Sequence, residues 1–180
     1  MSSPYANYGT AFFGVEYRVN GLWNNLLSQF YKTGAADKDF IISPEAYPKP
    51  DDTKGLKADL LVSSLISKGS GFSISTPMLV YEGKGANGDS FPDIMDQLEN
   101  WLAEAALLKP FDCWAIGTRG SQVAFLVWQQ DTIQWLNWGG SKPIPVSSQK
   151  VFDITKDADW NTVVAMLAFF NGNPLQRIDV

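Results

Sequence analysis

The sequence contains no histidine in its 180 residues. Catalysis by Ser-His-Asp or Cys-His groups therefore lacks its base, and zinc sites of the Cys/His type lack their imidazole ligands. Any chemistry must come from carboxylates, lysine, hydroxyl groups or a metal ion held by oxygen atoms. The candidate sites are thus clusters of acidic and basic side chains.

Cysteine and long apolar segments are also scarce. The single cysteine, Cys113, lies in an apolar segment, which is typical of core packing in a reducing compartment. No apolar run approaches the roughly 18 residues that a membrane span needs. Residues 1–7 lack the basic and apolar regions of a secretory signal. We therefore expect an intracellular protein, in the cytoplasm or nucleus, without a membrane segment.

The overall composition is that of a globular chain. Hydrophobic residues make up 45% and aromatic residues 13%, and the length suits one domain spanning residues 1–180. The net charge of −5 argues against a protein that coats nucleic acid non-specifically, although a local basic groove is compatible with it. An acidic total also fits a site with several carboxylates that divalent cations complete.

Hydrophobic periodicity predicts the order helix, three strands, helix, and then further strands and a helix. A mixed sheet with helices packed on it, an α/β (α+β) fold, is the expected product. Helices are predicted at residues 10–31, from about 87–92 to 108, and from 157 or 159 to 172; strands are predicted at 39–43, 57–66, 78–84, 113–118, 122–129, 132–138 and 151–154, with a loop at 141–148. Gly34 and Gly172 are the expected helix ends, and Asp157 or Asp159 is the expected cap of the last helix.

One stretch, residues 78–85, combines a buried strand with charge. Apolar residues lead into Glu82, Gly83 and Lys84. Because side chains alternate along a strand, Glu82 and Lys84 point to one face and Tyr81 to the other. Charge at the margin of a core must be paired, solvated or bound to a metal.

Hairpin geometry selects a second carboxylate for this stretch. Paired residues of an antiparallel hairpin have a constant index sum, and a turn centred at residue 70 gives a sum near 140. Asp59 and Glu82 sum to 141, so they should lie across from each other. The acidic run at residues 50–52 would require a turn inside the strand at 57–66, and we prefer Asp59.

Two opposed carboxylates repel each other unless a cation lies between them. Hard oxygen ligands with few protein contacts suit Mg²⁺ or Mn²⁺. We therefore expect a divalent cation shared by Asp59 and Glu82.

An Asp on one strand followed by Glu-Xaa-Lys on the next, inside this order of elements, resembles the PD-(D/E)XK nuclease superfamily. That group includes restriction endonucleases, Holliday-junction resolvases, phage-type exonucleases and cap-snatching viral endonucleases. The resemblance covers about residues 10–128. It implies a restriction-endonuclease-like αβββαβ core with extra C-terminal strands and a helix, and hydrolysis of phosphodiester bonds in DNA or RNA. Homodimers are frequent among such proteins.

The resemblance also implies a ligand set for Mg²⁺ or Mn²⁺. Asp59 and Glu82 would be the metal-binding carboxylates, and the carbonyl of Gly83 would be a further ligand. Glu16, on the first helix, would match a glutamate that completes the metal shell in many members. From its spacing alone, Glu16 lies on the inward face of that helix or at its margin, where its side chain could equally extend to water.

Two further residues would act on the substrate. By the resemblance, Lys84 positions or activates the attacking water and stabilises charge on the phosphate, while Gln97, on the second helix, lies near that water. With Asp59 and Glu82 they form the implied catalytic set. Ala58 stands where many members have proline, which the superfamily tolerates.

Two alternatives remain open. Asp59, Glu82 and Lys84 could be a solvated ion-pair cluster, which contributes little to stability. The chain could instead be a catalytically silent binding module that contacts protein or nucleic acid, with Trp128, Trp135 and Trp138 forming an exposed aromatic surface or, more commonly, core. Basic residues that could rim a cleft or be scattered are Lys49, Lys54, Lys57, Lys68, Arg119, Lys142 and Lys150.

Overall fold

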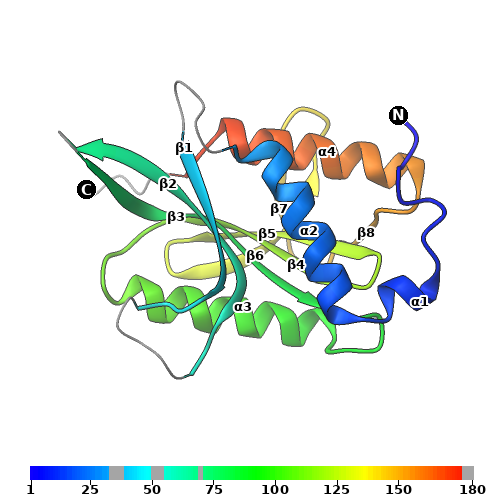
Figure 1. Ribbon diagram of the computed structural model, residues 1–180, viewed down its shortest axis with the longest axis horizontal. Coiled ribbons are helices and arrows are strands. Elements are labelled where there is room, and N and C mark those ends of the chain that lie inside the picture. Colours follow the sequence, from blue (N-terminus) through cyan, green and yellow to red (C-terminus); the bar gives the residue numbers. More distant parts are fainter. Residues whose placement is uncertain (33–38, 50–54, 69–70, 176–180) are drawn as a thin grey trace.

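The computed structural model describes residues 1–32, 39–49, 55–68 and 71–175. In this part of the chain, eight strands form one mixed sheet with helices on both of its faces (Figure 1). The predicted α/β character and the mixed sheet flanked by helices are confirmed. Within the described ranges, no helix is both long and apolar enough to cross a membrane.

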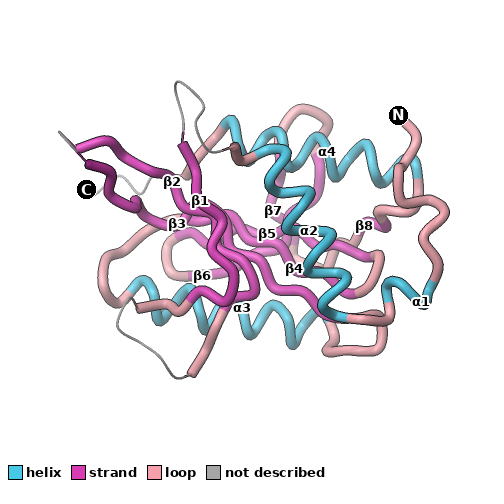
Figure 2. Tube along the Cα trace, viewed as in Figure 1, coloured by secondary structure: helices cyan, strands magenta, loops and turns pink. Residues whose placement is uncertain are grey.

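The elements follow the predicted order of helix, three strands, helix, and further strands and a helix (Figure 2). Their bounds, in chain order, are α1 (Thr10–Phe13), α2 (Glu16–Phe30), β1 (Asp39–Ala46), β2 (Ala58–Lys68), β3 (Gly71–Lys84), α3 (Phe91–Ala106), β4 (Cys113–Arg119), β5 (Gln122–Gln129), β6 (Thr132–Trp138), β7 (Pro143–Val146), β8 (Phe152–Asp153) and α4 (Asp157–Gly172).

The sheet combines antiparallel and parallel pairs. Strands β1, β2 and β3 are antiparallel neighbours, and β3 then pairs with β4 in parallel. A parallel pair needs a crossover connection, which α3 supplies. Strands β4 to β7 continue antiparallel, and β8 pairs with β5. Because β3 lies between β2 and β4, its last residues are next to the start of β2 and the end of β4.

Each face of β3 packs against a different hydrophobic core. Leu79 and Tyr81 belong to the core that includes the buried side chains of α2 and α4, whereas Val80 belongs to the core that includes those of α3. All three side chains are fully buried. This alternation is what a strand covered on both sides requires. Glu82 and Lys84 have the same parity as Val80, so they point toward the α3 side.

A capping box fixes the start of α3. The Ser90 hydroxyl accepts a hydrogen bond from the Asp93 N–H, and the Asp93 carboxylate accepts one from the Ser90 N–H. Pro92 lies in the first turn, where its missing N–H costs nothing. The connection from Lys84 to α3 therefore ends at a defined point. The helix was predicted to continue to residue 108, but it ends at Ala106, and Leu108 is 61% exposed.

The opening helix predicted for residues 10–31 is in fact two helices. α1 ends at Phe13 and α2 begins at Glu16. A Cβ atom added to Gly85 would lie 2.6 Å from the Gly14 carbonyl oxygen, and the Ala86 N–H donates to the Phe13 carbonyl at 2.8 Å. The break therefore coincides with a close contact to the chain beyond β3, which periodicity along one helix does not reveal.

Two other local predictions were wrong. Residues 141–148 were expected as a loop, but Pro143–Val146 form β7. β7 pairs with β6 at the end of the strand order, and an edge strand tolerates proline because it need not donate on its free side. The N-cap of α4 is Lys156 rather than Asp157 or Asp159. The expected helix end at Gly34 lies outside the described residues.

Candidate functional site

The β2–β3 register brings Asp59 beside Glu82. Three neighbouring pairs of the two strands, Leu60 with Tyr81, Leu61 with Val80 and Val62 with Leu79, have residue numbers that sum to 141. This is the sum that was predicted for Asp59 and Glu82. One residue on, the Gly83 N–H donates to Asp59 Oδ2 at 2.8 Å. The predicted juxtaposition is therefore confirmed. The rejected acidic residues at 51 and 52 lie outside the described ranges.

Glu82 and Lys84 form a largely buried ion pair. Lys84 Nζ lies 2.6 Å from Glu82 Oε1, and the two side chains are only 15% and 7% exposed. We call Asp59, Glu82 and Lys84 the acid–lysine cluster. The sequence had left open a solvated ion-pair cluster on the surface, and the burial of this pair argues against that alternative. Surface ion pairs contribute little to stability, whereas the two charges of a buried pair interact strongly.

Burial, and then a second carboxylate, make Glu82 hard to ionise. Burial, and then the charge of Asp59, raise the pKa of Glu82 from 4.5 to about 7, although hydrogen bonds from Lys84 and the Asp59 backbone oppose the shift. The positive charge of Lys84 therefore does not overcome the combined effect of burial and of the second acid. A further cation beside the two carboxylates would favour the ionised form of Glu82.

Lys84 keeps its charge at neutral pH. Burial lowers its pKa, but the hydrogen bond to Glu82 and the charges of Glu82, Glu16 and Asp59 together raise it above the ordinary value. The lysine is therefore a fixed positive charge, and it is not suited to take up a proton as a base.

A buried hydrogen-bond network lies on the opposite face of β3. The Tyr81 hydroxyl donates to Asn20 Oδ1 at 3.1 Å and lies 2.8 Å from the Thr118 hydroxyl. It thus ties β3 to α2 and to β4. A Cβ atom on Gly83 would lie 2.1 Å from Tyr81 Oη and 2.2 Å from Asn20 Oδ1. Glycine at this position allows the close packing that fixes the backbone between Glu82 and Lys84.

Sequence reasoning missed Asn20 and Thr118 as supports of this site. No local signal marks them, because their partner Tyr81 is 61 and 37 residues away along the chain. The predicted alternation placed Tyr81 on the face away from Glu82, but it did not identify the partners of the Tyr81 hydroxyl group.

Glu16 lies near the cluster with its side chain in solvent. It occupies the first turn of α2 and is exposed, so of the placements left open it is the one at the margin, with the side chain extending to water. The break after α1 makes Glu16 the first residue of a new helix. Its charge raises the pKa of both Tyr81 and Lys84, so the residue lies within electrostatic reach of the cluster.

Gln97 has a different partner from the one its implied role requires. It is half-buried on α3, and its side-chain amide donates to Asp89 Oδ2 at 2.9 Å. Asp89 belongs to the connection between β3 and α3. Among the described hydrogen bonds of Gln97, none reaches the acid–lysine cluster.

Several basic side chains proposed as a rim already have partners elsewhere. Lys49 pairs with Glu104, and Lys57 pairs with Glu45 at 3.1 Å. Arg119 donates to the Gly88 carbonyl at 3.2 Å. Arg119 lies close to the cluster, since it is the register partner of Lys84. Lys54 lies outside the described residues.

The tryptophans considered as an exposed surface are mostly covered. Trp128 is 2% exposed and belongs to the core beneath α3. Trp135 and Trp138 are half-buried and pack against the two cores. The core interpretation of these three side chains is therefore the correct one.

The carboxylate oxygens of Asp59 and Glu82 are of the type that a hard divalent cation prefers. Asp59 lies close enough for its charge to raise the pKa of Glu82, and its Oδ2 accepts a hydrogen bond from the Gly83 N–H. Mg²⁺ is commonly bound by one or two carboxylates with water completing its shell. In the described part of the chain, no group of three or more Asp, Glu, His or Cys side chains is arranged to hold a metal ion.

Comparison of the chain with protein-family models, with curated proteins and with solved structures gave no match.

Proposed function

We propose that this protein is a metal-dependent nuclease that hydrolyses phosphodiester bonds of DNA or RNA. The observation that carries the proposal is the acid–lysine cluster, in which two carboxylates and one buried lysine meet where β2 starts and β3 ends. The order of α2, three strands, α3 and β4 agrees with a restriction-endonuclease-like core, to which the sequence was similar.

In this proposal Asp59 and Glu82 hold Mg²⁺ or Mn²⁺, with the Gly83 carbonyl as a further ligand. The cation would supply a hydroxide at neutral pH and neutralise charge on the phosphate. Glu16 would reach the metal shell from the first turn of α2. Its exposure leaves its carboxylate accessible to water and to a bound ion.

Lys84 has the properties that phosphate stabilisation requires. It is charged at neutral pH and held in place by Glu82, so no rearrangement is needed when charge develops on the phosphate. Ionisation of Glu82 is the step that a cation would favour. Gln97 would act near the attacking water only after exchanging its hydrogen bond with Asp89.

A second candidate is a binding module that uses the same fold without cleavage. The observation that favours it is that Glu82 is already paired with Lys84 and that its raised pKa lets it be protonated near neutral pH. Because the charge of Glu82 can be neutralised by Lys84 or by a proton, the folded protein does not require a bound metal ion to be stable.

The two candidates separate in a cleavage assay on single- and double-stranded DNA and RNA. We expect the wild-type chain to cleave at least one of these substrates with Mg²⁺ or Mn²⁺ and none with EDTA. Asp59→Asn should lower the rate by about 100-fold or more, because it removes one of two metal-binding charges.

The matched control for this assay is Asp96→Asn, which neutralises an exposed carboxylate on α3. It should cleave at the wild-type rate. Equal cleavage by wild type and Asp59→Asn would indicate a contaminating nuclease and refute the site. Binding of nucleic acid without cleavage would support the binding module.

A further inference from the structure

Asparagine is followed by glycine at three places in the chain, at residues 20–21, 87–88 and 171–172. In such a pair the backbone nitrogen of glycine can attack the side-chain carbonyl carbon of asparagine, because glycine has no Cβ atom to hinder the approach. The new C–N bond closes a succinimide ring, and the side-chain amide leaves as ammonia with the proton of the glycine N–H. Water then opens the ring, so the reaction needs no other reactant.

Two of these pairs lie inside helices. Asn20 is within α2, and Asn171 is in the last turn of α4. Both side chains are held by hydrogen bonds: Asn20 Oδ1 accepts one from the Tyr81 hydroxyl, and Asn171 Nδ2 donates one to the Phe30 carbonyl, each at 3.1 Å. The attack would require each side chain to leave its partner and the helix to open around the following glycine.

The third pair, Asn87 with Gly88, lies in the connection between β3 and α3. Both residues are exposed, and in the described part of the chain the Asn87 side chain has no hydrogen-bond partner. The Gly88 N–H donates to the Gly85 carbonyl at 2.8 Å, which closes a single turn. One exposed hydrogen bond of this kind opens at a smaller free-energy cost than a bond inside a helix.

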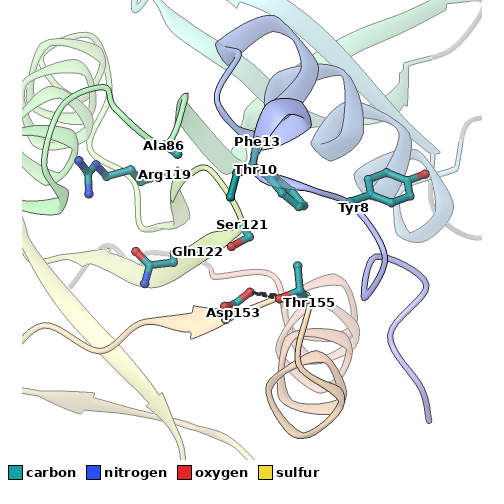
Figure 3. Close-up of a pocket in the computed structure, with 9 residues that line it drawn as sticks. All are labelled: Tyr8, Thr10, Phe13, Ala86, Arg119, Ser121, Gln122, Asp153 and Thr155. Carbon is teal, nitrogen blue, oxygen red and sulfur yellow. Dashed lines mark hydrogen bonds between the residues drawn. The ribbon is translucent and has the colours of Figure 1, made fainter.

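The connection that carries this pair is fixed at both ends. The Ala86 N–H donates to the Phe13 carbonyl at 2.8 Å, and Ala86 lies in the wall of a cavity that Phe13 and Ser121 also line (Figure 3). At the other end, the capping box fixes the start of α3. Residues 87–89 are therefore the part of the connection that can reach the attack geometry without disturbing the sheet.

We propose that Asn87 is a site of spontaneous deamidation, which converts it to aspartate and isoaspartate faster than Asn20 or Asn171 in the folded protein. Opening of the ring at the side-chain carbonyl gives aspartate. Opening at the main-chain carbonyl gives isoaspartate, in which the peptide continues through the side chain and the backbone is one methylene longer. The site requires only the turn and water, so it does not depend on the nuclease proposal.

Both products place a new carboxylate beside the acid–lysine cluster. Gly88 packs on Lys84, because a Cβ atom added to Gly88 would lie 2.9 Å from Lys84 Cβ. Arg119 Nε donates to the Gly88 carbonyl at 3.2 Å, and Gln97 donates to Asp89 Oδ2 at 2.9 Å. Since the connection is fixed at both ends, the extra methylene of isoaspartate has to displace residues 88 and 89 and break these two hydrogen bonds.

Peptide mapping by mass spectrometry of the full chain, incubated at pH 8, tests the site. The same incubation in urea is the control, because the three asparagines are then equally accessible and should be lost at similar rates. In the folded protein Asn87 should be lost about tenfold faster than Asn20 or Asn171, because its turn opens more easily than a helix. Similar rates at the three positions of the folded protein, or slower loss at Asn87, would overturn the proposal.

Variants separate the two products. Asn87→Gln has a longer side chain that closes the ring poorly, so it should accumulate no isoaspartate at this turn. Asn87→Asp has the new charge without the extra methylene and should keep the Tm of fresh wild type. Wild type converted to isoaspartate should unfold about 2–4 °C lower, because two hydrogen bonds are lost. An unchanged Tm would refute the displacement of residues 88 and 89.

Discussion

Replacing Lys84 with methionine should slow cleavage by about 10²–10³-fold, the usual loss on removal of one preorganised charge at a reacting centre. Methionine keeps an unbranched apolar stem in a position that is 15% exposed. The loss should therefore come from the ammonium group and not from packing. The rate is measured at saturating Mn²⁺, so that a change in metal affinity does not contribute.

The matched control is Lys49→Met, which breaks another lysine–glutamate pair, the one with Glu104. It should cleave at the wild-type rate. Cleavage by Lys84→Met at the wild-type rate would remove the lysine from the mechanism and reduce the cluster to a structural ion pair.

The second large effect concerns stability and pH. The folded pKa of Glu82 is about 7 against an ordinary 4.5, so folding favours its protonated form. The contribution of Glu82 to stability is therefore complete below pH 4.5 and falls by about 3 kcal/mol as the pH rises through 7. Glu82→Gln cannot ionise and should not show this loss.

Urea unfolding between pH 4 and 8 measures the difference between the two proteins. At pH 4 the two proteins should have similar free energies of unfolding. At pH 8 the free energy of unfolding of Glu82→Gln should exceed that of wild type by up to about 3 kcal/mol, and the loss of the charged partner of Lys84 reduces this difference. Glu99→Gln, a half-buried carboxylate on α3, is the control and should follow wild type. Parallel curves for Glu82→Gln and wild type would mean that Glu82 is not forced toward its neutral form.

The position of the cluster could be predicted because it depends on one hairpin. An antiparallel hairpin keeps a constant index sum as long as its register is regular, so a turn near residue 70 was enough to bring Asp59 close to Glu82. The pairs near the turn sum to 139, and the register shifts on either side of Ser63 raise the sum to 141 at Leu60 and Tyr81. The sequence did not predict these shifts, which complete the alignment of Asp59 with Glu82. Element order also follows from local periodicity, and it was correct from α2 to β6.

The features that were not predicted depend on segments distant in the sequence. The break between α1 and α2 accompanies the close approach of Gly14 to Gly85, and it leaves Glu16 as the exposed first residue of α2. The network of Tyr81 with Asn20 and Thr118 is likewise assembled from separate elements. No spacing within a single strand or helix reports such contacts.

The central claim is that Asp59 and Glu82 share a divalent cation, and thermal unfolding at pH 8 with increasing Mn²⁺ tests it most directly. A concentration 100-fold above the dissociation constant stabilises a protein by about 2.7 kcal/mol, which for a chain of this length raises the Tm by about 5–10 °C. We expect that increase in wild type and in Lys84→Met, and none in Asp59→Asn or Glu82→Gln. An equal increase in all four proteins, or none in wild type, would contradict the claim.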